Sequence, residues 1–215
     1  MYDVSSGVYA LESSAIAVNY NQFQNMKGPY PRGQMVQFDN VSGADSRVNY
    51  NRGENFLGSS YPEDAISMYE SRGTQNDPIQ IIGNWIRGGG PSPTGSGICL
   101  GDDGGENMIA KDNVLVNPGQ CGICISSGTN IQIVDNKIYS KKQYFTNVGI
   151  SVWNEYKKGC AINVVKGNEV KWINSLGSEN DMWNGENCGK VTGWTENTPN
   201  AKIDATILPS KIITK

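Results

Sequence analysis

The chain has 215 residues, a formal net charge of −3 and 18% charged residues, with a sequence pI of about 5.1. Nucleic acids and anionic membranes bind proteins through a basic face, so this charge balance argues against both partners. No stretch approaches the roughly 20 apolar residues that cross a bilayer, so we expect no membrane insertion. The chain contains no histidine, which removes the usual serine-hydrolase triad and most zinc chemistry.

Short alternating runs recur along the chain, as in Ile123-Cys124-Ile125. Alternating apolar spacing marks a strand with one buried face, and strands this short need similar neighbours above and below them. An Asn followed two positions later by an apolar residue closes each unit. This ending occurs at Asn21, Asn84, Asn113, Asn136 and Asn168, with a degenerate copy at Asn51. The intervals between these positions are 30, 33, 29, 23 and 32 residues.

An apolar-x-apolar strand precedes most of these endings. Such strands begin at Val8, Val36, Ile66, Ile98, Ile123 and Ile150. A repeat of 20 to 50 residues that is built of short strands, without helices between them, predicts a parallel β-helix. The pattern resembles the right-handed parallel β-helix repeat of the pectate-lyase-like superfamily over roughly residues 8–173. The resemblance implies an all-β, single-stranded, right-handed solenoid, and it leaves the activity open because that superfamily contains lyases, hydrolases, epimerases, phage tailspikes and non-catalytic surface proteins.

The chain divides at turns that are rich in Gly and Pro. We expect about six coils within residues 1–174, the first over residues 1–26, and connections at residues 27–33 and 88–95. The repeat is lost from residue 175, and residues 175–215 are expected to form a C-terminal cap that folds back over the last coil. Trp183 and Trp194 are expected to pack inside that cap rather than bind sugar, because a cap must bury large side chains.

The start of the chain leads straight into the first expected strand. A β-helix leaves the core and the strand edges of its first coil open unless something covers them. We therefore expect a missing N-terminal segment, or a partner or second copy of the chain, at this end.

Five cysteines leave at least one thiol unpaired. We expect a disulfide between Cys160 and Cys188, which flank the last coil and the tail. Cys99 and Cys124 fall at the same repeat position on successive coils, either as neighbouring thiols or as a bridge between coils, and spacing does not decide between these pairings. Cys121 and Cys124 have the spacing of a redox motif, but on a strand rather than at a helix N-terminus, which disfavours that function.

Two polar rows run up the expected stack. The Asn row is interpreted as a structural ladder, because an Asn amide bonds to the backbone and to the next Asn. The second row is acidic and contains Asp39, Glu70, Asp102 and Asp103 at the ends of successive strands, about 4.8 Å apart along the axis. Like charges at this distance raise one another's pKa, which suits a general acid, or they bind a cation such as Ca²⁺. The alternative is that acidic residues simply favour turns at strand ends.

These four residues are the candidate catalytic groups, and Glu70, Asp102 and Asp103 are the candidate Ca²⁺ ligands. Polygalacturonases of the superfamily use an adjacent Asp pair, which Asp102 and Asp103 resemble. However, the pair here follows its strand instead of leading into it, and the His of that family is missing. Pectate lyases combine Ca²⁺ with an Arg or Lys base, and Arg72 is the basic residue that we include in the site.

Aromatic side chains lie beside the same face. Tyr9, Tyr69 and Trp153 suit stacking against sugar rings, although they could equally shield the sheet. The leading interpretation is an extracellular β-helix that binds or cleaves a polysaccharide along the acidic face, as a polysaccharide lyase or a glycoside hydrolase. The alternative is a non-catalytic structural or adhesive module that assembles end to end.

Overall fold

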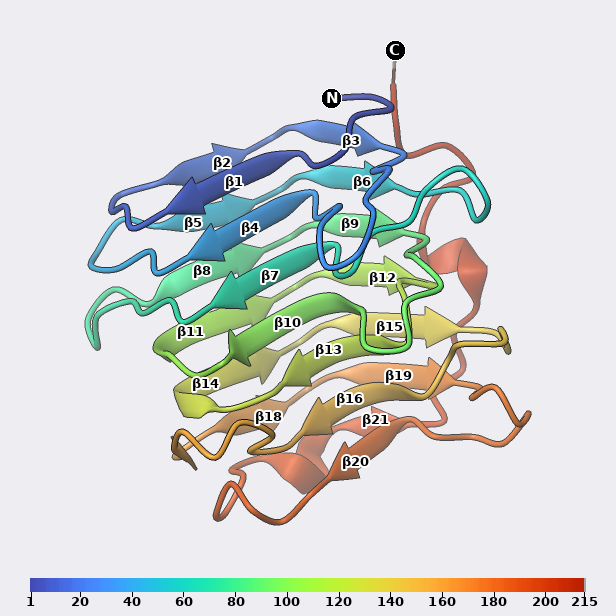
Figure 1. The fold of residues 1–215 in the computed structure, drawn as a ribbon. Coiled ribbons are helices and arrows are strands. Elements are labelled where there is room, and N and C mark those ends of the chain that lie inside the picture. Colours follow the sequence, from blue (N-terminus) through green and yellow to red (C-terminus); the bar gives the residue numbers. More distant parts are fainter. Residues whose placement is uncertain (215) are drawn as a thin grey trace.

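A computed structural model describes residues 1–214. The chain winds through about six turns, and the turns contribute short strands to three parallel sheets (Figure 1). This architecture confirms the expected all-β parallel β-helix. The described residues contain two short 3₁₀ helices, η1 (Trp194–Glu196) and η2 (Ala205–Ile207), and no other helix. None of the helices in this part of the chain is long and apolar enough to span a membrane.

The first sheet carries the candidate site. Its strands, in spatial order, are β1 (Val8–Leu11), β4 (Val36–Asp39), β7 (Ile66–Tyr69), β10 (Ser96–Asp102), β13 (Cys121–Ile125), β16 (Val148–Val152) and β20 (Met182–Asn184). The second sheet contains β2 (Ala17–Asn19), β5 (Arg47–Asn49), β8 (Ile79–Ile82), β11 (Glu106–Lys111), β14 (Gly128–Val134), β17 (Cys160–Ala161) and β18 (Val164–Lys166). The third contains β3 (Gln22–Gln24), β6 (Arg52–Glu54), β9 (Trp85–Arg87), β12 (Val114–Val116), β15 (Lys137–Ser140), β19 (Glu169–Trp172) and β21 (Thr198–Pro199).

The core is a stack of apolar side chains between the three sheets. Met108 pairs in register with Ile79 on one side and Ile131 on the other. Ala110 likewise lies between Ile81 and Ile133. All of these side chains are fully buried. The inward residues of the second sheet therefore stack in register, and burying each large aliphatic side chain contributes roughly 1.5–3 kcal/mol.

The Asn row forms the expected ladder at the corner between the second and third sheets. Asn113 is fully buried, and its Oδ1 accepts hydrogen bonds of 2.9 Å from both the backbone and the side-chain amide of Asn84. Its own side-chain amide donates to Asn136 and to the carbonyl of Ile81. The ladder continues to Asn197, whose Oδ1 accepts hydrogen bonds from the backbone and side-chain amides of Asn168. Asn197 was not among the Asn positions expected from the repeat. These bonds satisfy the amides within the stack, which supports a structural interpretation.

Residues after position 174 differ from the cap that we expected. Strands β20 and β21 extend the first and third sheets by another turn, and a disulfide joins Cys160 to Cys188, the expected pair. Trp194 packs partly buried against the end of the core, as expected of a cap residue. Trp183 does not, because its side chain is exposed on the first sheet.

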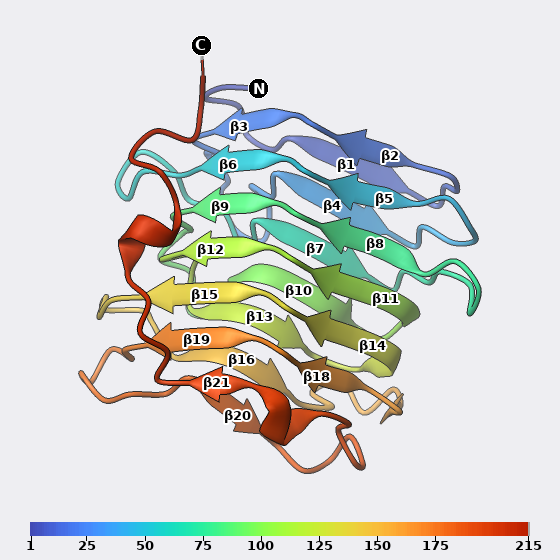
Figure 2. The same ribbon diagram turned by 180° about the vertical axis from the view of Figure 1, so that it is seen from behind.

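The last residues run back along the third sheet (Figure 2). We call residues 207–214 the C-terminal strap. Leu208, Ile212 and Ile213 are buried in a small cluster with Val116, and Arg87 donates hydrogen bonds to three carbonyl groups of the strap. The strap therefore lies along the side of the solenoid, from the later turns to the first, rather than across the last coil.

Candidate functional site

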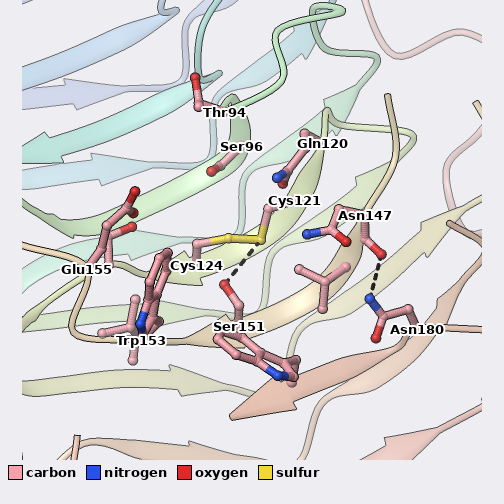
Figure 3. Close-up of a pocket in the computed structure, with 14 residues that line it drawn as sticks. Thr94, Ser96, Gln120, Cys121, Cys124, Asn147, Ser151, Trp153, Glu155 and Asn180 are labelled. Carbon is pink, nitrogen blue, oxygen red and sulfur yellow. Dashed lines mark hydrogen bonds between the residues drawn. A yellow bond between two sulfur atoms is a disulfide. The ribbon is translucent and has the colours of Figure 1, made fainter. Parts of the chain in front are cut away.

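A groove runs along the outer face of the first sheet. It consists of two adjoining cavities of about 380 and 510 Å³ that share Thr94, Ser126 and Glu155 in their walls. Loops bring Arg32, Thr94 and Glu155 over the sheet, while strands supply the floor. The cavity near β16 and β20 is shown in Figure 3. The groove thus crosses several turns in the direction of the solenoid axis.

One half of the groove is acidic. Its carboxyl groups belong to Asp39, Glu63, Asp64, Asp102 and Glu155. Among the described residues, Asp64, Cys99 and Asp102 form the one group of metal-ligand type, with one potential ligand atom from each lying within 4.8 Å of the others. Asp64 and Cys99 are buried and Asp102 is partly buried. Carboxyl groups this close cannot both ionise without mutual repulsion.

The pKa values of three of these carboxyl groups are raised. Burial raises the pKa of Asp64 well above its ordinary value, and the nearby Asp102 and Glu63 raise it further. Burial is also the main cause of the raised pKa of Asp102. Burial raises the pKa of Glu155 as well, and the nearby charge of Asp102 raises it further. Burial likewise raises the pKa of the Cys99 thiol, so the thiol form is favoured. Carboxyl groups with raised pKa values can hold a proton near neutral pH, which a general acid requires.

Hydrogen bonds distinguish Asp102 from Asp64. Asp102 accepts a hydrogen bond of 2.9 Å from the hydroxyl of Tyr156 and one of 3.3 Å from Ser67, and both bonds lower its pKa against the effect of burial. Asp64 accepts a 2.7 Å bond from the backbone amide of Ser96, and bonds from Ser96 lower its pKa as well, but burial outweighs them and holds the pKa well above its ordinary value. Asp64 therefore holds a proton more readily than Asp102, whose pKa is raised less strongly. Such a separation of two carboxyl groups is typical of acid–base pairs.

The other half of the groove is aromatic and uncharged except for Glu155. Trp153 and Trp183 are 43% and 45% exposed, and their ring centroids lie 6.0 Å apart in an edge-to-face arrangement. Side-chain amides of Gln120, Asn147 and Asn180 line the same cavity (Figure 3). Exposed indole rings beside amides can stack on sugar rings while the amides bind hydroxyl groups.

The cysteines in the groove differ from both arrangements that we considered for Cys99 and Cys124. Cys121 and Cys124 form a disulfide, and Cys99 is a buried free thiol. Cys99 and Cys124 are nevertheless partners in the register of β10 and β13, as their repeat positions indicated.

The four acidic residues that we expected in one row lie in two. Asp39 and Asp102 belong to the first row, and Glu70 and Asp103 lie one residue further along the chain. Asp39 pairs with Tyr69, and Tyr69 pairs with Asp102 across an irregularity in β10. Glu70 lies one position further, where it accepts a hydrogen bond from Asn40. Asp39 lies three residues after Val36, whereas Glu70 lies four residues after Ile66, so the unshifted register of β4 and β7 separates them. The additional residue in β10 brings Asp102 level with Tyr69.

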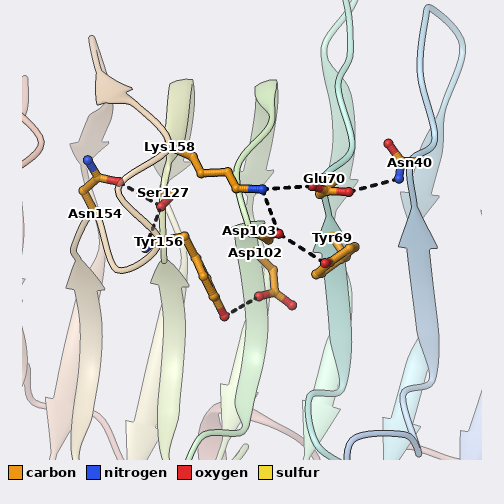
Figure 4. A network of polar contacts seen from close by, with 9 residues as sticks. All are labelled: Asn40, Tyr69, Glu70, Asp102, Asp103, Ser127, Asn154, Tyr156 and Lys158. Atoms are coloured by element: carbon orange, nitrogen blue, oxygen red, sulfur yellow. Dashed lines mark hydrogen bonds and ion pairs between the residues drawn. The ribbon is translucent and has the colours of Figure 1, made fainter.

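A lysine offsets part of the negative charge of the second row. The ammonium group of Lys158 lies 3.2 Å from Glu70 and 3.0 Å from Asp103 (Figure 4). Asp103 also accepts a hydrogen bond from Tyr69. Lys158 therefore supplies the positive charge for which we had expected Ca²⁺ at Glu70 and Asp103, and neither of these residues lines the groove.

The remaining sequence candidates lie in different places. Tyr69 lines the acidic half and Trp153 the aromatic half. The hydroxyl of Tyr9 donates to Asp39, and the guanidinium of Arg32 lies 5.0 Å from the centre of its ring. Arg72 is exposed in the turn after β7 and lines neither part of the groove.

Sequence analysis missed three of the most informative residues. Asp64 precedes β7, and period-two counting from Ile66 assigns it to the inner face. The alternation fails there because the chain enters the sheet from a corner, where Ala65 is also buried in the core. Glu155 and Tyr156 lie in the loop after β16, which folds back over earlier turns, and no strand pattern predicts where a loop lies.

Comparison of the chain with protein-family models, with curated proteins and with solved structures finds no match. The function is therefore argued from the site itself.

Proposed function

We propose that the protein is a glycoside hydrolase that binds a polysaccharide along the groove. The observation that carries the proposal is the pair of carboxyl groups, Asp64 and Asp102, in a groove that continues to two exposed tryptophans. Glycoside hydrolysis commonly uses one protonated and one ionised carboxyl group on either side of the bond that breaks. Asp64 is the proton donor to the glycosidic oxygen, and Asp102 is the carboxylate that attacks the sugar. Oxygens of the two groups lie within 4.8 Å of each other, which is close to the spacing of retaining glycosidases and too short for a water between them.

The position of the aromatic half supports an extended substrate. Trp153 and Glu155 come from the same loop, so the indole pair and the acidic half are linked through a single short segment. A sugar stacked on the indoles would place further sugars along the sheet toward Asp64 and Asp102. This arrangement suits a chain of several sugar units rather than a single small molecule.

The groove suits hydrolysis better than lyase chemistry. A lyase that acts on uronic acids must neutralise the substrate carboxylate and provide a base, and cations serve the first purpose. Arg32 is the one basic side chain in the lining, whereas carboxyl groups surround the centre. Arg72, which we had expected among the substrate-binding residues, does not line the groove.

The proposal includes a relationship to the pectate-lyase-like superfamily and an extracellular location. The three-sheet solenoid and the Asn ladder support the first. The second is supported by two disulfides, Cys121–Cys124 and Cys160–Cys188, because disulfides persist mainly in oxidising compartments.

The test is a screen of soluble polysaccharides for new reducing ends and for unsaturated products that absorb ultraviolet light. Reducing ends without unsaturated products support the hydrolase, and unsaturated products would contradict it. Adjacent residues offer a matched pair of variants for the substrate so identified. Asp102→Asn should lower turnover roughly 10²–10⁴-fold, whereas Asp103→Asn, which changes a carboxylate outside the groove, should retain most of the activity.

A non-catalytic binding module is the second candidate. The exposed Trp153 and Trp183 favour it, because sugar stacking needs no acid–base chemistry. This candidate predicts retention by a polysaccharide gel that depends on the two tryptophans, with no release of reducing ends.

A further inference from the structure

We propose, on the basis of the proposed function, that the groove selects polysaccharides without anionic groups and rejects uronate and sulfated polymers. The proposal names a substrate class for the same site. It rests on the charges, the hydrogen-bonding groups and the lining of the groove.

Charge in the groove is predominantly negative. The acidic half contains five carboxyl groups against one guanidinium group, that of Arg32. This guanidinium donates to Oε1 of Gln37 at 3.1 Å and lies over the ring of Tyr9. Lys158 is held by Glu70 and Asp103 outside the lining. A carboxylate or sulfate on the substrate would therefore meet five carboxyl groups and a single cation, and the excess of like charge disfavours binding.

The polar groups of the acidic half are mainly hydrogen-bond acceptors. The carboxyl oxygens of Asp39, Glu63 and Asp102 line this cavity as acceptors. Glu155 adds two further acceptor oxygens, whereas Asp64 is assigned here as a proton donor. Sugar hydroxyl groups can donate to these oxygens, whereas an ionised carboxylate on a sugar can only accept. The acidic half thus matches a ligand that is rich in donors.

The aromatic half leads to the same substrate class. Gln120, Asn147 and Asn180 supply amides, and Glu155 is the only charged residue in the lining of this cavity. Amides bind hydroxyl groups in both directions as donors and acceptors. No lysine or arginine in this lining is available to recognise an anionic sugar.

The experiment measures binding of the full chain at pH 7 by affinity electrophoresis in gels that contain one polysaccharide each. The probes are matched pairs: hydroxyethyl cellulose with carboxymethyl cellulose, galactan with polygalacturonate, and mannan with mannuronan. We expect at least one neutral member to retard the protein at least about tenfold more strongly than its anionic partner. Stronger retardation by an anionic member would overturn the selectivity while leaving the proposed function intact.

Reducing-end release from the same six polymers separates the two claims. If no polymer retards or is cleaved by the protein, the proposed function fails and the selectivity fails with it. The double variant Glu63→Gln, Glu155→Gln keeps the size and one acceptor oxygen of each side chain. It should increase retardation by carboxymethyl cellulose at least about fivefold because it removes two repelling charges. The matched variant Glu169→Gln, Glu196→Gln changes the same net charge away from the groove and should leave retardation nearly unchanged. An equal effect of both double variants would also overturn the selectivity.

Discussion

The hydroxyl of Tyr156 donates a hydrogen bond of 2.9 Å to Oδ1 of Asp102, a residue 54 positions earlier in the chain. Tyr156 follows β16, and Asp102 ends β10, so the bond spans two strands of the first sheet. A loop of one turn thereby influences the protonation of a side chain on another turn.

Replacing Tyr156 with Phe should raise the pKa of Asp102 further, because this hydrogen bond lowers the pKa against the effect of burial. Titration of carbon-13 labelled Asp side chains by NMR measures the change directly and needs no substrate. Tyr20→Phe, which changes a tyrosine that is 76% exposed and outside the groove, should leave the Asp102 titration as it is. An unchanged or lower Asp102 pKa in Tyr156→Phe would contradict the assigned role of the hydroxyl.

The Asp64→Asn substitution should change how stability depends on pH. The pKa of Asp64 is higher in the folded state than its ordinary value of 3.8, so the folded state binds this proton more tightly than the unfolded state. The parent protein therefore loses stability as pH rises from about 4 through the folded-state pKa of Asp64. Asn cannot ionise, and its Oδ1 can keep the bond from Ser96. We expect Asp64→Asn to be more stable relative to the parent at pH 8 than at pH 4, as measured by urea unfolding at a series of pH values.

Asp77→Asn is the control of opposite sign. Hydrogen bonds from the Asp45 backbone and from Arg47 lower the pKa of Asp77. A lowered pKa contributes stability above the ordinary value and loses it as pH falls. Asp77→Asn should therefore be less stable relative to the parent at pH 5 than at pH 2, with little change between pH 8 and pH 5. The same sign of pH dependence in both variants would refute the assigned burial effect at Asp64.

Loss of a central ladder residue should be costly. Asn113→Ala removes the oxygen that accepts from the backbone and side-chain amides of Asn84. It also removes the N–H groups that donate to Ile81 and Asn136 within this fully buried row. Buried groups left without partners cost about 1–3 kcal/mol each, so we expect a loss of about 3 kcal/mol or more in the free energy of unfolding. Asn21→Ala, at the exposed end of the ladder, should cost less than about 1 kcal/mol. Equal losses in chemical denaturation would show that the ladder does not add stability through its buried members.

Removing the disulfide of the last turns should loosen them selectively. The variant Cys160→Ser, Cys188→Ser lacks a bridge that typically contributes about 2–4 kcal/mol. Hydrogen exchange should show lost protection in β20 and β21, with β10 and β13 unaffected. The strap should stay protected as well, because Val116 and Arg87 hold it independently of the bridge. Loss of protection throughout the chain would instead indicate that the turns unfold as one unit.

The sequence determines the fold more directly than the site. Apolar positions such as Ile131 and Ile133 recur at fixed places in each coil, and a buried stack tolerates little variation there, so the repeat was predictable. The Asn positions were predictable for the same reason, since each Asn bonds to the next one. Asp39, Asp102, Tyr69 and Trp153 also line the groove as expected of an outer face.

The parts that could not be predicted depend on irregular backbone. The additional residue in β10 brought Asp102 level with Tyr69, and the corner before β7 turned Asp64 outward. Lys158 contacts Glu70 across 88 residues, a separation set by how one loop folds over its neighbours. Period-two spacing carries no information about these three features.

The C-terminal strap limits how this solenoid can change in length. In a simple repeat protein each turn contacts only its neighbours, so a turn can be duplicated or deleted with little effect elsewhere. Here the strap runs beside several turns, with Arg52 bonded to the carbonyl of Ile212 and Gln22 bonded to Thr214. An inserted turn would lengthen the stack by about 4.8 Å, and the strap would then no longer reach both contacts without additional residues of its own. The number of repeats is thereby coupled to the length of a segment that does not repeat.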